Sequence, residues 1–443
     1  MTRYFGTDGI RGVAGTQLTY DMAFALGQIA VEVLGPIQVI GRDTRRSGAA
    51  FERALTAGIT HAGGEALLAG VIPTPAVALL VRELAASGGV VISASHNPPE
   101  YNGIKFFDAQ GFKLTTALED AFEERLQAIL DSASPLSFLE HSDENDTGTP
   151  IPNAAARYVA YAAATVTQQG IDLTGLKVAV DCGHGASFET TPQALRALGA
   201  EVVAINTTYN GDDINVDCGS THLGPLKELV ARTGAAVGLA HDGDADRLIA
   251  VDAAGNERDG DFIEAVCAVD LQARGLLKKQ TVVSTVAGNL GFVRAMKEHG
   301  IDVVQTSVGD SNVLEAMRAG GYNLGGEQSG HTIFLDHNST GDGLVSALQL
   351  LAAMKRSGKP LARLAQVMTR YPQVLINVKV ADKTAALASA ALNAAIDAAQ
   401  IHLQDNGRVL VRPSGTEPLV RVMVEAPSEE LAQELAQRIA DEL

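Results

Sequence analysis

The hydrophobic pattern predicts one unit three times along the chain: a short apolar strand, an amphipathic helix and a second strand. The three copies span residues 37–70, 177–205 and 281–305. Each helix ends near a glycine, as a C-terminal cap does, and each closing strand begins with an acidic residue. Repeated βαβ units are typical of sheets covered by helices, so we expect three related α/β domains with mixed sheets.

The last part of the chain has a different pattern. After about residue 370 the sequence predicts strand 374–380, helix 383–398, strands 408–412 and 419–424, and helix 429–443. Two neighbouring strands without a helix between them do not fit another βαβ unit. We therefore expect a small C-terminal α+β domain.

Breaks in these patterns indicate the domain boundaries. The stretch 141–152 is acidic and contains glycine and proline, which is typical of a linker before the helix expected at 153–166. A second boundary near residues 251–260 is less marked, because a hairpin turn would use the same residue types. The expected domains are 1–150, 151–252, 253–368 and 369–443.

The composition disfavours several classes of protein and of binding partner. The 443 residues are 46% hydrophobic, which is enough to bury several cores. A net charge of −18 disfavours nucleic acid and anionic membranes as partners, but permits a small phosphorylated ligand. The apolar runs are far shorter than the ~20 residues of a membrane span, and the first residues lack the apolar core of a signal peptide. Cys182, Cys218 and Cys267 are scattered and odd in number, so we expect reduced thiols and a cytoplasmic location.

Candidate chemistry is concentrated in the stretch Ser93–Phe107, where one predicted strand ends. The apolar run 89–92 predicts a buried strand, and ligands bind at the carboxyl ends of strands in open α/β sheets. Ser95 and His96 follow this strand, the next two prolines forbid a helix, and a second strand returns Lys105 towards the serine. These residue types on rigid backbone suit covalent chemistry, but a polar hairpin loop explains this stretch alone equally well.

Two loops near the amino terminus are further candidates for ligand contact. Residues 5–12 contain closely spaced glycines around Arg11, which permit a ligand to approach the backbone, although a turn uses the same residues. Arg42, Arg45 and Arg46 follow the next predicted strand and precede a helix, which is typical of an anion-binding edge. A solvated basic loop is the slightly favoured interpretation of these arginines.

An acidic triplet follows the strand-like run in the middle of the chain. Asp242, Asp244 and Asp246 would repel one another without a bound cation. A calcium EF-hand begins with the same spacing, but it requires glycine and glutamate where this chain has Arg247 and Ala253. Oxygen ligands without a cysteine or histidine cluster favour Mg²⁺ over Zn²⁺, and a solvated acidic loop is the alternative.

Two later loops carry groups that bind sugars or phosphates. Residues 325–331 place a carboxylate, an amide, a hydroxyl and an imidazole between glycines, which suits a polyol, although a polar turn needs the same residues. Residues 412–418 lie between two predicted strands. Together with Arg421 they form a nest suited to a phosphate dianion, with a tight turn as the alternative.

Taken together, these motifs resemble the α-D-phosphohexomutase superfamily over the whole chain. The motifs are Ser-Ala-Ser-His-Asn-Pro at 93–98, Asp-Gly-Asp-Ala-Asp-Arg at 242–247, Gly-Glu-Gln-Ser-Gly-His at 326–331 and Arg-Pro-Ser-Gly-Thr-Glu-Pro at 412–418. Within the superfamily, residues 5–12 and Gln328 resemble the branch of bacterial phosphoglucosamine mutases. The phosphomannomutase/phosphoglucomutase branch typically has methionine at the position of Gln328.

The resemblance implies four domains around a central cleft, the first three alike. It implies an isomerase that interconverts glucosamine 6-phosphate and glucosamine 1-phosphate through a phosphoserine and a glucosamine 1,6-bisphosphate intermediate. The product would feed UDP-N-acetylglucosamine and peptidoglycan synthesis. One Mg²⁺ per active site is implied, and glucosamine 1,6-bisphosphate or another phosphate donor would activate the serine. The expected partner is a hexosamine phosphate, and a homodimer is left open.

The same resemblance implies a role for each motif residue. Ser95 would carry the phosphate, and Asp242, Asp244 and Asp246 would hold Mg²⁺ together with an oxygen of that phosphate. Around the transferring group would lie Arg11, His96, Lys105, Arg247 and His331. Glu327 and Ser329 would bind sugar hydroxyls. The substrate's own phosphate would be bound by Arg412, Ser414, Gly415, Thr416 and Arg421. The general base and the group that recognises the 2-amino substituent are not assigned.

Other classes of function fit less well. A serine hydrolase would need a G-x-S-x-G elbow, and a kinase or NTPase of the P-loop type would need G-x-x-x-x-G-K-[ST], and the sequence contains neither. A sugar-phosphate-binding protein without catalysis is disfavoured by the intact Ser95 and the complete triplet. Phosphoglucomutase or phosphomannomutase activity is the nearest alternative and stays open.

Overall fold

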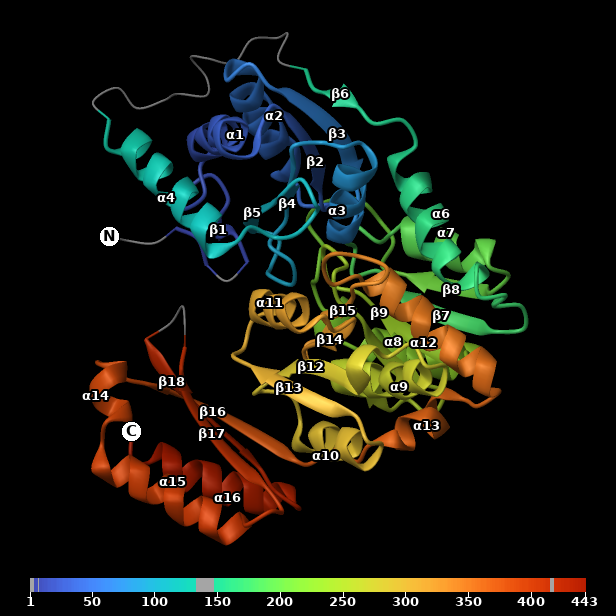
Figure 1. The fold of residues 1–443 in the computed structure, drawn as a ribbon, viewed down its shortest axis with the longest axis vertical. Helices are drawn as coiled ribbons and strands as arrows, with labels where there is room; N and C mark the ends of the chain where they lie inside the picture. The colour runs from blue at the N-terminus through green and yellow to red at the C-terminus, as the bar shows by residue number, and fades with distance from the viewer. Residues whose placement is uncertain (1–3, 7, 133–146, 415–417) are drawn as a thin grey trace.

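The computed structural model describes residues 4–6, 8–132, 147–414 and 418–443, and its strands form four sheets in chain order (Figure 1). The first domain contains β1 (Ile10–Val13), α1 (Tyr20–Leu34), β2 (Ile37–Arg42), α2 (Gly48–His61), β3 (Glu65–Val71), α3 (Thr74–Glu83), β4 (Gly88–Ile92), β5 (Tyr101–Phe107), α4 (Thr116–Leu130) and β6 (Thr149–Pro150). Its sheet has the order β1-β5-β4-β2-β3-β6. All five residues of β4 are buried, as its run of apolar residues predicts.

The second domain contains a five-stranded sheet of order β11-β10-β9-β7-β8. Its elements are α6 (Ala154–Thr167), β7 (Lys177–Asp181), α7 (Thr190–Ala197), β8 (Glu201–Ile205), α8 (Gly224–Thr233), β9 (Val237–Ala240), β10 (Ile249–Asp252) and β11 (Glu257–Arg258), with a short 3₁₀ turn at Gly219–Thr221. β10 and β11 form a hairpin, so this sheet extends past residue 252.

The third domain contains a four-stranded sheet of order β13-β12-β14-β15. Its elements are α9 (Gly260–Ala273), β12 (Thr281–Thr285), α10 (Leu290–Glu298), β13 (Asp302–Thr306), α11 (Asp310–Gly320), β14 (Leu324–Gly326), β15 (Thr332–Phe334), α12 (Gly343–Ser357) and α13 (Leu361–Leu364), with 3₁₀ turns at Lys278–Gln280 and Ala365–Val367. β14 includes Gly325 and Gly326, the first two residues of the stretch 325–331.

The first three sheets share one topology. The order of closing strand, opening strand, third strand and antiparallel fourth strand recurs as β3-β2-β4-β5, β8-β7-β9-β10 and β13-β12-β14-β15. The prediction of three βαβ units is therefore confirmed, and each closing strand begins with the expected acidic residue, Glu65, Glu201 or Asp302. The turn between the third and fourth strands consequently occupies an equivalent position in all three domains.

The C-terminal domain is an antiparallel sheet of order β16-β18-β17 covered by helices, as its sequence pattern predicts. It contains β16 (Gln373–Lys379), α14 (Lys383–Leu387), α15 (Ala390–Leu403), β17 (Arg408–Pro413), β18 (Leu419–Glu425) and α16 (Glu429–Ala440). The single helix expected at 383–398 is wrong. Ser389 accepts a hydrogen bond from the Leu392 backbone N–H, so it ends the first helix and caps a second one that continues to Leu403.

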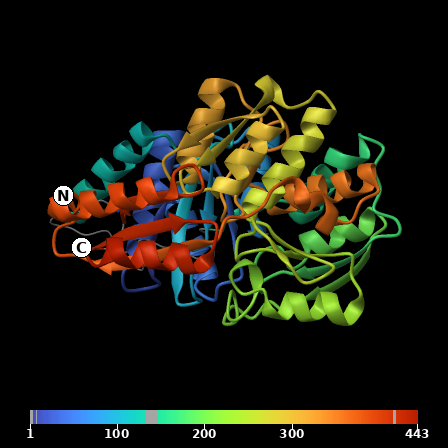
Figure 2. The same cartoon turned by 90° about the horizontal axis from the view of Figure 1, so that it is seen from below.

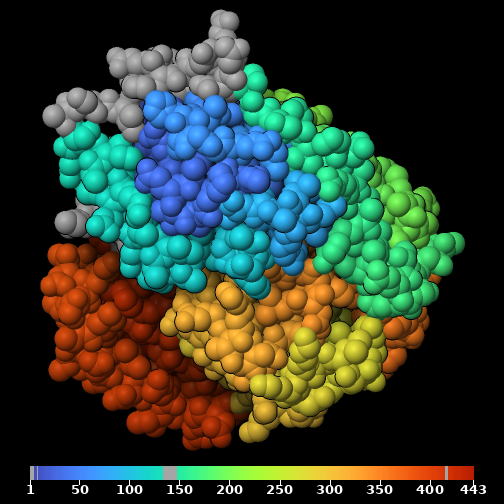
Figure 3. All heavy atoms as spheres, turned by 45° about the horizontal axis from the view of Figure 1, so that its top comes forward, coloured from blue at the N-terminus to red at the C-terminus, as the bar shows by residue number. Residues whose placement is uncertain are grey.

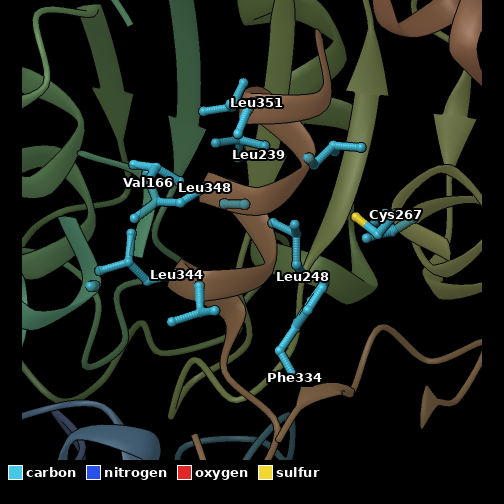
Figure 4. Close-up of a cluster of buried hydrophobic side chains, with 14 of the residues drawn as sticks. Val166, Leu239, Leu248, Cys267, Phe334, Leu344, Leu348 and Leu351 are labelled. Carbon is cyan, nitrogen blue, oxygen red and sulfur yellow. The ribbon is translucent and has the colours of Figure 1, made fainter. Parts of the chain in front are cut away.

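One hydrophobic core joins the second and third domains through α12. From Gly343 to Met354 every residue of this helix is buried, and apart from Ser346 and Gln349 none of them has a polar side chain. Figure 4 shows Leu344, Leu348 and Leu351 of α12 in one cluster with Val166 of α6 and Leu239 of β9. Burial of such side chains contributes about 1.5–3 kcal/mol each, so the two domains are strongly held together.

The C-terminal domain has a core of its own, formed between its sheet and α15 and α16. Figure 2 shows this domain, in red, at one side of the molecule and the second domain, in green, at the other. In Figure 3 its surface borders the cyan part of the first domain and the orange third domain, with a furrow along the border. Among the described residues, no helix is long and apolar enough to cross a membrane.

Two expectations about loops need correction. The glycine-rich residues 5–12 are not a loop throughout, because Ile10–Val13 form β1 and pair antiparallel with β5. The linker expected at 141–152 lies partly outside the described residues, and its end forms the edge strand β6, which pairs with β3. The expected domain boundaries stay predictions.

Candidate active site

The turn between β4 and β5 gives Ser93 and Ser95 different environments. Ser95 has a backbone φ of 52°, and its buried hydroxyl donates a hydrogen bond to Asp242 Oδ2 at 2.6 Å. The same hydroxyl lies 3.3 Å from His96 Nδ1. Ser93 Oγ donates to Asp43 Oδ2 at 2.5 Å and accepts from the Ser95 backbone N–H at 2.9 Å. Ser93 therefore supports the backbone of the turn, whereas the Ser95 hydroxyl faces the acidic triplet.

Arg45 holds this turn in its left-handed conformation. Its side chain is fully buried and pairs with Asp43 at 3.0 Å. Its guanidinium donates hydrogen bonds to four backbone carbonyls of the turn, those of Ser95, Asn97, Pro98 and Tyr101. A planar guanidinium has five N–H donors in a fixed fork, so one side chain can fix several carbonyls at once.

The expected anion-binding edge at Arg42, Arg45 and Arg46 is therefore wrong. The Arg45 guanidinium donates its hydrogen bonds to the turn, and Arg42 Nη1 donates to the Tyr209 hydroxyl at 2.6 Å. Arg46 pairs with Asp212 and its side chain is 75% exposed, so the interpretation as a solvated basic loop holds for this residue only. These arginines looked alike in sequence because their partners lie far along the chain, 50 residues away for the Ser95 carbonyl at Arg45 and 167 for Tyr209 at Arg42.

The acidic triplet forms the equivalent turn of the second domain, between β9 and β10. Asp242, Asp244 and Asp246 are buried, and each offers a carboxylate oxygen within 4.8 Å of those of the other two. Among the described residues, Asp244 Oδ1 and Asp246 Oδ1 have no hydrogen-bond partner. Buried carboxylate oxygens without partners are costly, so a hard cation that prefers oxygen ligands fits this site.

The electrostatics of the triplet support a cation site. Burial, followed by the charges of Asp246 and Asp244, raises the pKa of Asp242 well above its usual value. Lys105 Nζ lies 2.8 Å from both Asp244 Oδ2 and Asp8 Oδ2. Burial would raise the pKa of Asp244, but the charge of Lys105 and the hydrogen bonds from Lys105 and Thr74 together outweigh it and the pKa falls. Burial would likewise lower the pKa of Lys105, but the carboxylates outweigh it and the pKa rises. Asp242 is thus the carboxylate that most needs an additional positive charge.

Arg247 connects the triplet to the Ser95 turn. Its Nε lies 3.8 Å from carboxylate oxygens of Asp242 and Asp246, and its Nη1 lies 3.0 Å from His96 Nδ1. Burial, then Arg247 and Arg11, lowers the pKa of His96 to about 4. The imidazole is therefore neutral at neutral pH, and its Nδ1 can accept a hydrogen bond from the guanidinium.

The third equivalent turn, between β14 and β15, carries Glu327, Ser329 and His331. His331 Nε2 lies 3.8 Å from Asp246 Oδ2, and its backbone forms a β-bridge with Arg247 of the second domain. Gly330 has a φ of 96°, and a Cβ there would lie 2.4 Å from the Leu248 carbonyl oxygen. A residue without a side chain is therefore needed for the two turns to meet.

The C-terminal domain presents two opposed arginines. Arg412 on β17 and Arg421 on β18 are directly paired across the sheet. Burial and Arg421 lower the pKa of Arg412, while Glu327 acts to raise it, so Arg412 lies within electrostatic reach of the third domain. Like charges directly opposite each other are unfavourable, which suits an anion between them. Ser414 is buried beside them, and Gly415 and Thr416 lie outside the described residues.

Sequence reasoning missed four residues of this cluster. Lys113 Nζ lies 2.7 Å from Asp8 Oδ1 and is also paired with Asp310, which links the first domain to the third. Asn215 Nδ2 donates to the Ser95 carbonyl at 2.8 Å from the second domain. Lys113, Asp310 and Asn215 are isolated polar residues whose partners lie far along the chain, so no local pattern could have indicated them, whereas Asp8 lies in the stretch 5–12 and pairs with Arg11 there.

Family models and relatives cover the whole chain. Four models described as phosphoglucomutase/phosphomannomutase α/β/α domains I, II and III and C-terminal domain match residues 2–132, 156–255, 259–371 and 375–442. A protein of Thermoanaerobacter sp. (strain X514) named phosphoglucosamine mutase is 48% identical, with 100% of this chain and 98% of the relative covered. One of the same name from Nocardioides sp. (strain ATCC BAA-499 / JS614) is 51% identical, over 100% of this chain and 98% of the relative.

Solved structures share the fold. A structure titled putative phosphomannomutase from Thermus thermophilus is 25% identical with a TM-score of 0.80, covering 99% of this chain and 98% of that one. Aspergillus fumigatus N-acetylphosphoglucosamine mutase, in complex with GlcNAc-6P and magnesium, is 20% identical with a TM-score of 0.71, covering 100% and 95%. With four matching domain models and full-length relatives near half identity, the chain belongs to the phosphoglucomutase/phosphomannomutase family of the α-D-phosphohexomutase superfamily.

Proposed function

We propose that this protein is a phosphoglucosamine mutase, which interconverts glucosamine 6-phosphate and glucosamine 1-phosphate in the cytoplasm. The observation that carries the proposal is the full-length similarity to proteins named phosphoglucosamine mutase. The contact between the Ser95 hydroxyl and Asp242 supports it, because the reaction needs a serine next to a metal site. The product would supply UDP-N-acetylglucosamine for peptidoglycan.

Ser95 would exchange a phosphoryl group with the sugar in two steps. Phosphoserine first donates its phosphoryl group to the free hydroxyl of the substrate: the bond between phosphorus and the Ser95 oxygen breaks, a proton lost by the substrate hydroxyl is balanced by one taken up by the Ser95 oxygen, and glucosamine 1,6-bisphosphate forms. The bisphosphate then turns end over end, and its other phosphoryl group returns to the Ser95 oxygen. The two steps balance, so the enzyme ends phosphorylated as it began. Glucosamine 1,6-bisphosphate or another phosphate donor is needed only to charge Ser95 initially.

Asp242, Asp244 and Asp246 would hold one Mg²⁺ together with an oxygen of the Ser95 phosphate. Bound there, Mg²⁺ would act as a Lewis acid that offsets the charge of the phosphoryl group. The magnesium in the complex of the Aspergillus fumigatus relative is consistent with this choice of ion. Phosphoserine carries about −1.5 to −2 charges, which the triplet alone would repel.

The positive side chains around the triplet would stabilise the transferring group. Arg11, Lys105 and Arg247 each approach one or more of its neighbouring carboxylates, and each can donate to a phosphate oxygen once phosphate is present. His96 and His331 complete this lining. Phosphoryl transfer depends mainly on in-line positioning and charge neutralisation, so a ring of fixed cations is the expected machinery.

The C-terminal domain would hold the end of the substrate that does not react. Arg412, Ser414, Gly415, Thr416 and Arg421 would bind the distal phosphate, while Glu327 and Ser329 would bind sugar hydroxyls between the two ends. This clamp must accept either the 1- or the 6-phosphate as the intermediate turns. The separate core of the C-terminal domain suits such a step, because the domain can move without disturbing the other three.

The proposed function is tested by comparing the turnover of three sugar phosphates. Purified protein charged with glucosamine 1,6-bisphosphate would be supplied with Mg²⁺ and with glucosamine 1-phosphate, glucose 1-phosphate or mannose 1-phosphate. We expect the highest kcat/KM with glucosamine 1-phosphate. Faster turnover of glucose or mannose 1-phosphate would instead identify a phosphoglucomutase or phosphomannomutase, and no turnover of any would contradict a mutase.

A further inference from the structure

An amino sugar differs from a hexose by a substituent that is a cation near neutral pH. A phosphoglucosamine mutase that prefers its substrate over the glucose phosphate therefore needs a group that recognises an ammonium. Phosphate and hydroxyl ligands do not supply this discrimination, because both sugars carry them. The natural acceptor is a carboxylate, since hydrogen bonds between charged partners are about twice as strong as neutral ones.

Asp310 is a carboxylate between the reacting end of the site and the hydroxyl-binding turn. It is the first residue of α11, which lies near the middle of Figure 1 below the first domain. Its Oδ2 lies 3.4 Å from His331 Nε2, which in turn lies 3.8 Å from Asp246 of the triplet. The side chain is 12% exposed, so it is not sealed from a ligand.

The residue before Asp310 contacts the hydroxyl-binding turn directly. The Gly309 backbone N–H donates to Glu327 Oε1 at 3.0 Å. In a pyranose, C2 lies between C1 and C3. If O1 is at Ser95 and a ring hydroxyl is at Glu327, the 2-substituent falls between them, on the stretch that Asp310 occupies. This is the orientation that glucosamine 6-phosphate takes, because its free hydroxyl is on C1.

In this cluster the carboxylates outnumber the lysines and arginines by one. Among the described residues, five carboxylates are joined by ion pairs to four lysines and arginines: Asp8, Asp242, Asp244, Asp246 and Asp310 with Arg11, Lys105, Lys113 and Arg247. The charges of Mg²⁺ and of a phosphoserine nearly cancel each other. One carboxylate in excess therefore matches an ammonium better than a neutral hydroxyl.

We propose that Asp310 accepts the 2-ammonium group of the hexosamine and sets the preference for amino sugars over hexoses. This inference rests on the proposed phosphoglucosamine mutase function. Lys113 is the resident partner of Asp310, but it is shared with Asp8 at 2.7 Å. When the substrate ammonium arrives, Lys113 keeps Asp8 as a partner, so no buried lysine is left without a counter-charge.

The test compares two substrates in one variant. Asp310→Asn keeps the size of the side chain and removes its charge, and kcat/KM would be measured for glucosamine 6-phosphate and for glucose 6-phosphate. We expect the ratio of the two to fall on the order of tenfold to a hundredfold, as for one lost charged hydrogen bond. With N-acetylglucosamine 6-phosphate, which has no ammonium, the variant should lose no more than with glucose 6-phosphate.

Asp8→Asn is the matched control, because it removes the other carboxylate that shares Lys113. It should lower turnover of both sugars together and leave their ratio unchanged. Should Asp310→Asn fold poorly, as judged by its thermal midpoint, Asp310→Ser would keep a polar helix start and test the same ratio. An unchanged ratio in either Asp310 variant, or a fall caused by Asp8→Asn, overturns the assignment. Preference of the unaltered protein for glucose 6-phosphate would instead overturn the proposed function.

Discussion

At the scale of single residues, the proposed phosphoryl transfer depends on how tightly Ser95 is held. Its left-handed backbone is unusual for a residue with a side chain and costs energy unless its surroundings enforce it. Arg45 supplies that enforcement through the carbonyls of Ser95 and of the residues that follow it, and Asn215 adds a second donor to the Ser95 carbonyl. A rigid backbone would keep the Ser95 oxygen aligned for in-line phosphoryl transfer.

Arg45→Lys should lower kcat far more than it changes KM. Lysine keeps the positive charge beside Asp43 but cannot reach four carbonyls from one fork, so the Ser95 oxygen loses its alignment. A misplacement of about 1 Å is enough for a loss on the order of a hundredfold in rate. Steady-state kinetics with glucosamine 6-phosphate would measure both constants.

The adjacent arginine is the control for this prediction. Arg46 is 75% exposed and paired with Asp212, so Arg46→Lys should leave kcat and KM within about twofold of the original protein, as expected for an exposed ion pair. Equal losses in the two variants, or a loss in KM alone for Arg45→Lys, would show that Arg45 does not position the serine.

Asp244→Asn should abolish turnover at ordinary Mg²⁺ concentrations. Asp244 Oδ2 already accepts hydrogen bonds from Thr74 and Lys105, so a neutral amide would weaken the cation site and remove one of the two carboxylates closest to Lys105, the other being Asp8. Calorimetry of Mg²⁺ binding would accompany the activity assay. The unaltered protein should lose activity in chelator and regain it with Mg²⁺, whereas persistence of turnover in chelator would contradict a functional metal site at the triplet.

At the scale of elements, the equivalent turn of each of the first three domains carries candidate site residues. The turn between the third strand and the antiparallel fourth strand carries Ser95 in the first domain, the triplet in the second and Glu327 to His331 in the third. Because the fold is repeated, three turns with different functional groups, a serine, a carboxylate triplet and a polar glycine-rich turn, lie at equivalent positions of their domains. The C-terminal domain contributes by a β-hairpin of its own, between β17 and β18.

Arg412→Ala should weaken substrate capture more than the transfer step. Loss of one charged contact to phosphate should cost about 1.5–3 kcal/mol of binding, which raises KM for glucosamine 6-phosphate by about tenfold or more. Arg438→Ala, on an exposed part of α16 in the same domain, should change neither constant. An unchanged KM in Arg412→Ala would remove the C-terminal hairpin from the substrate clamp.

The sequence predicted those elements whose signal is local. The βαβ repeats, the acidic triplet and the C-terminal strands all follow from patterns within a few residues. The break at Ser389 was missed because alanines on both sides favour helix equally and hide the cap. The roles of Arg45, Lys113 and Asp310 were missed because each is fixed by partners in distant segments.

At the scale of the whole molecule, the first three domains share one hydrophobic core, whereas the C-terminal domain has a separate core. The core around α12 includes side chains from the first three domains, so the turns that carry Ser95, the triplet and His331 are fixed relative to one another. The C-terminal domain has a core of its own, and among the described residues it is joined to the third domain by hydrogen bonds such as those from the Leu290 backbone N–H to Glu425 Oε2 at 3.1 Å and from Arg408 to the Gly288 carbonyl. A fixed reaction centre and a movable clamp are what a reorienting bisphosphate requires.

In the proposed reaction, Ser95 carries the phosphoryl group that is exchanged with the sugar. Protein incubated with glucosamine 1,6-bisphosphate would be digested and its phosphopeptides mapped by mass spectrometry, alongside Ser95→Ala and Ser93→Ala. We predict label on Ser95, essentially no mutase activity in Ser95→Ala, and a measurable fraction in Ser93→Ala, whose hydroxyl only supports the turn. Label on Ser93, or full activity in Ser95→Ala, would contradict the mechanism.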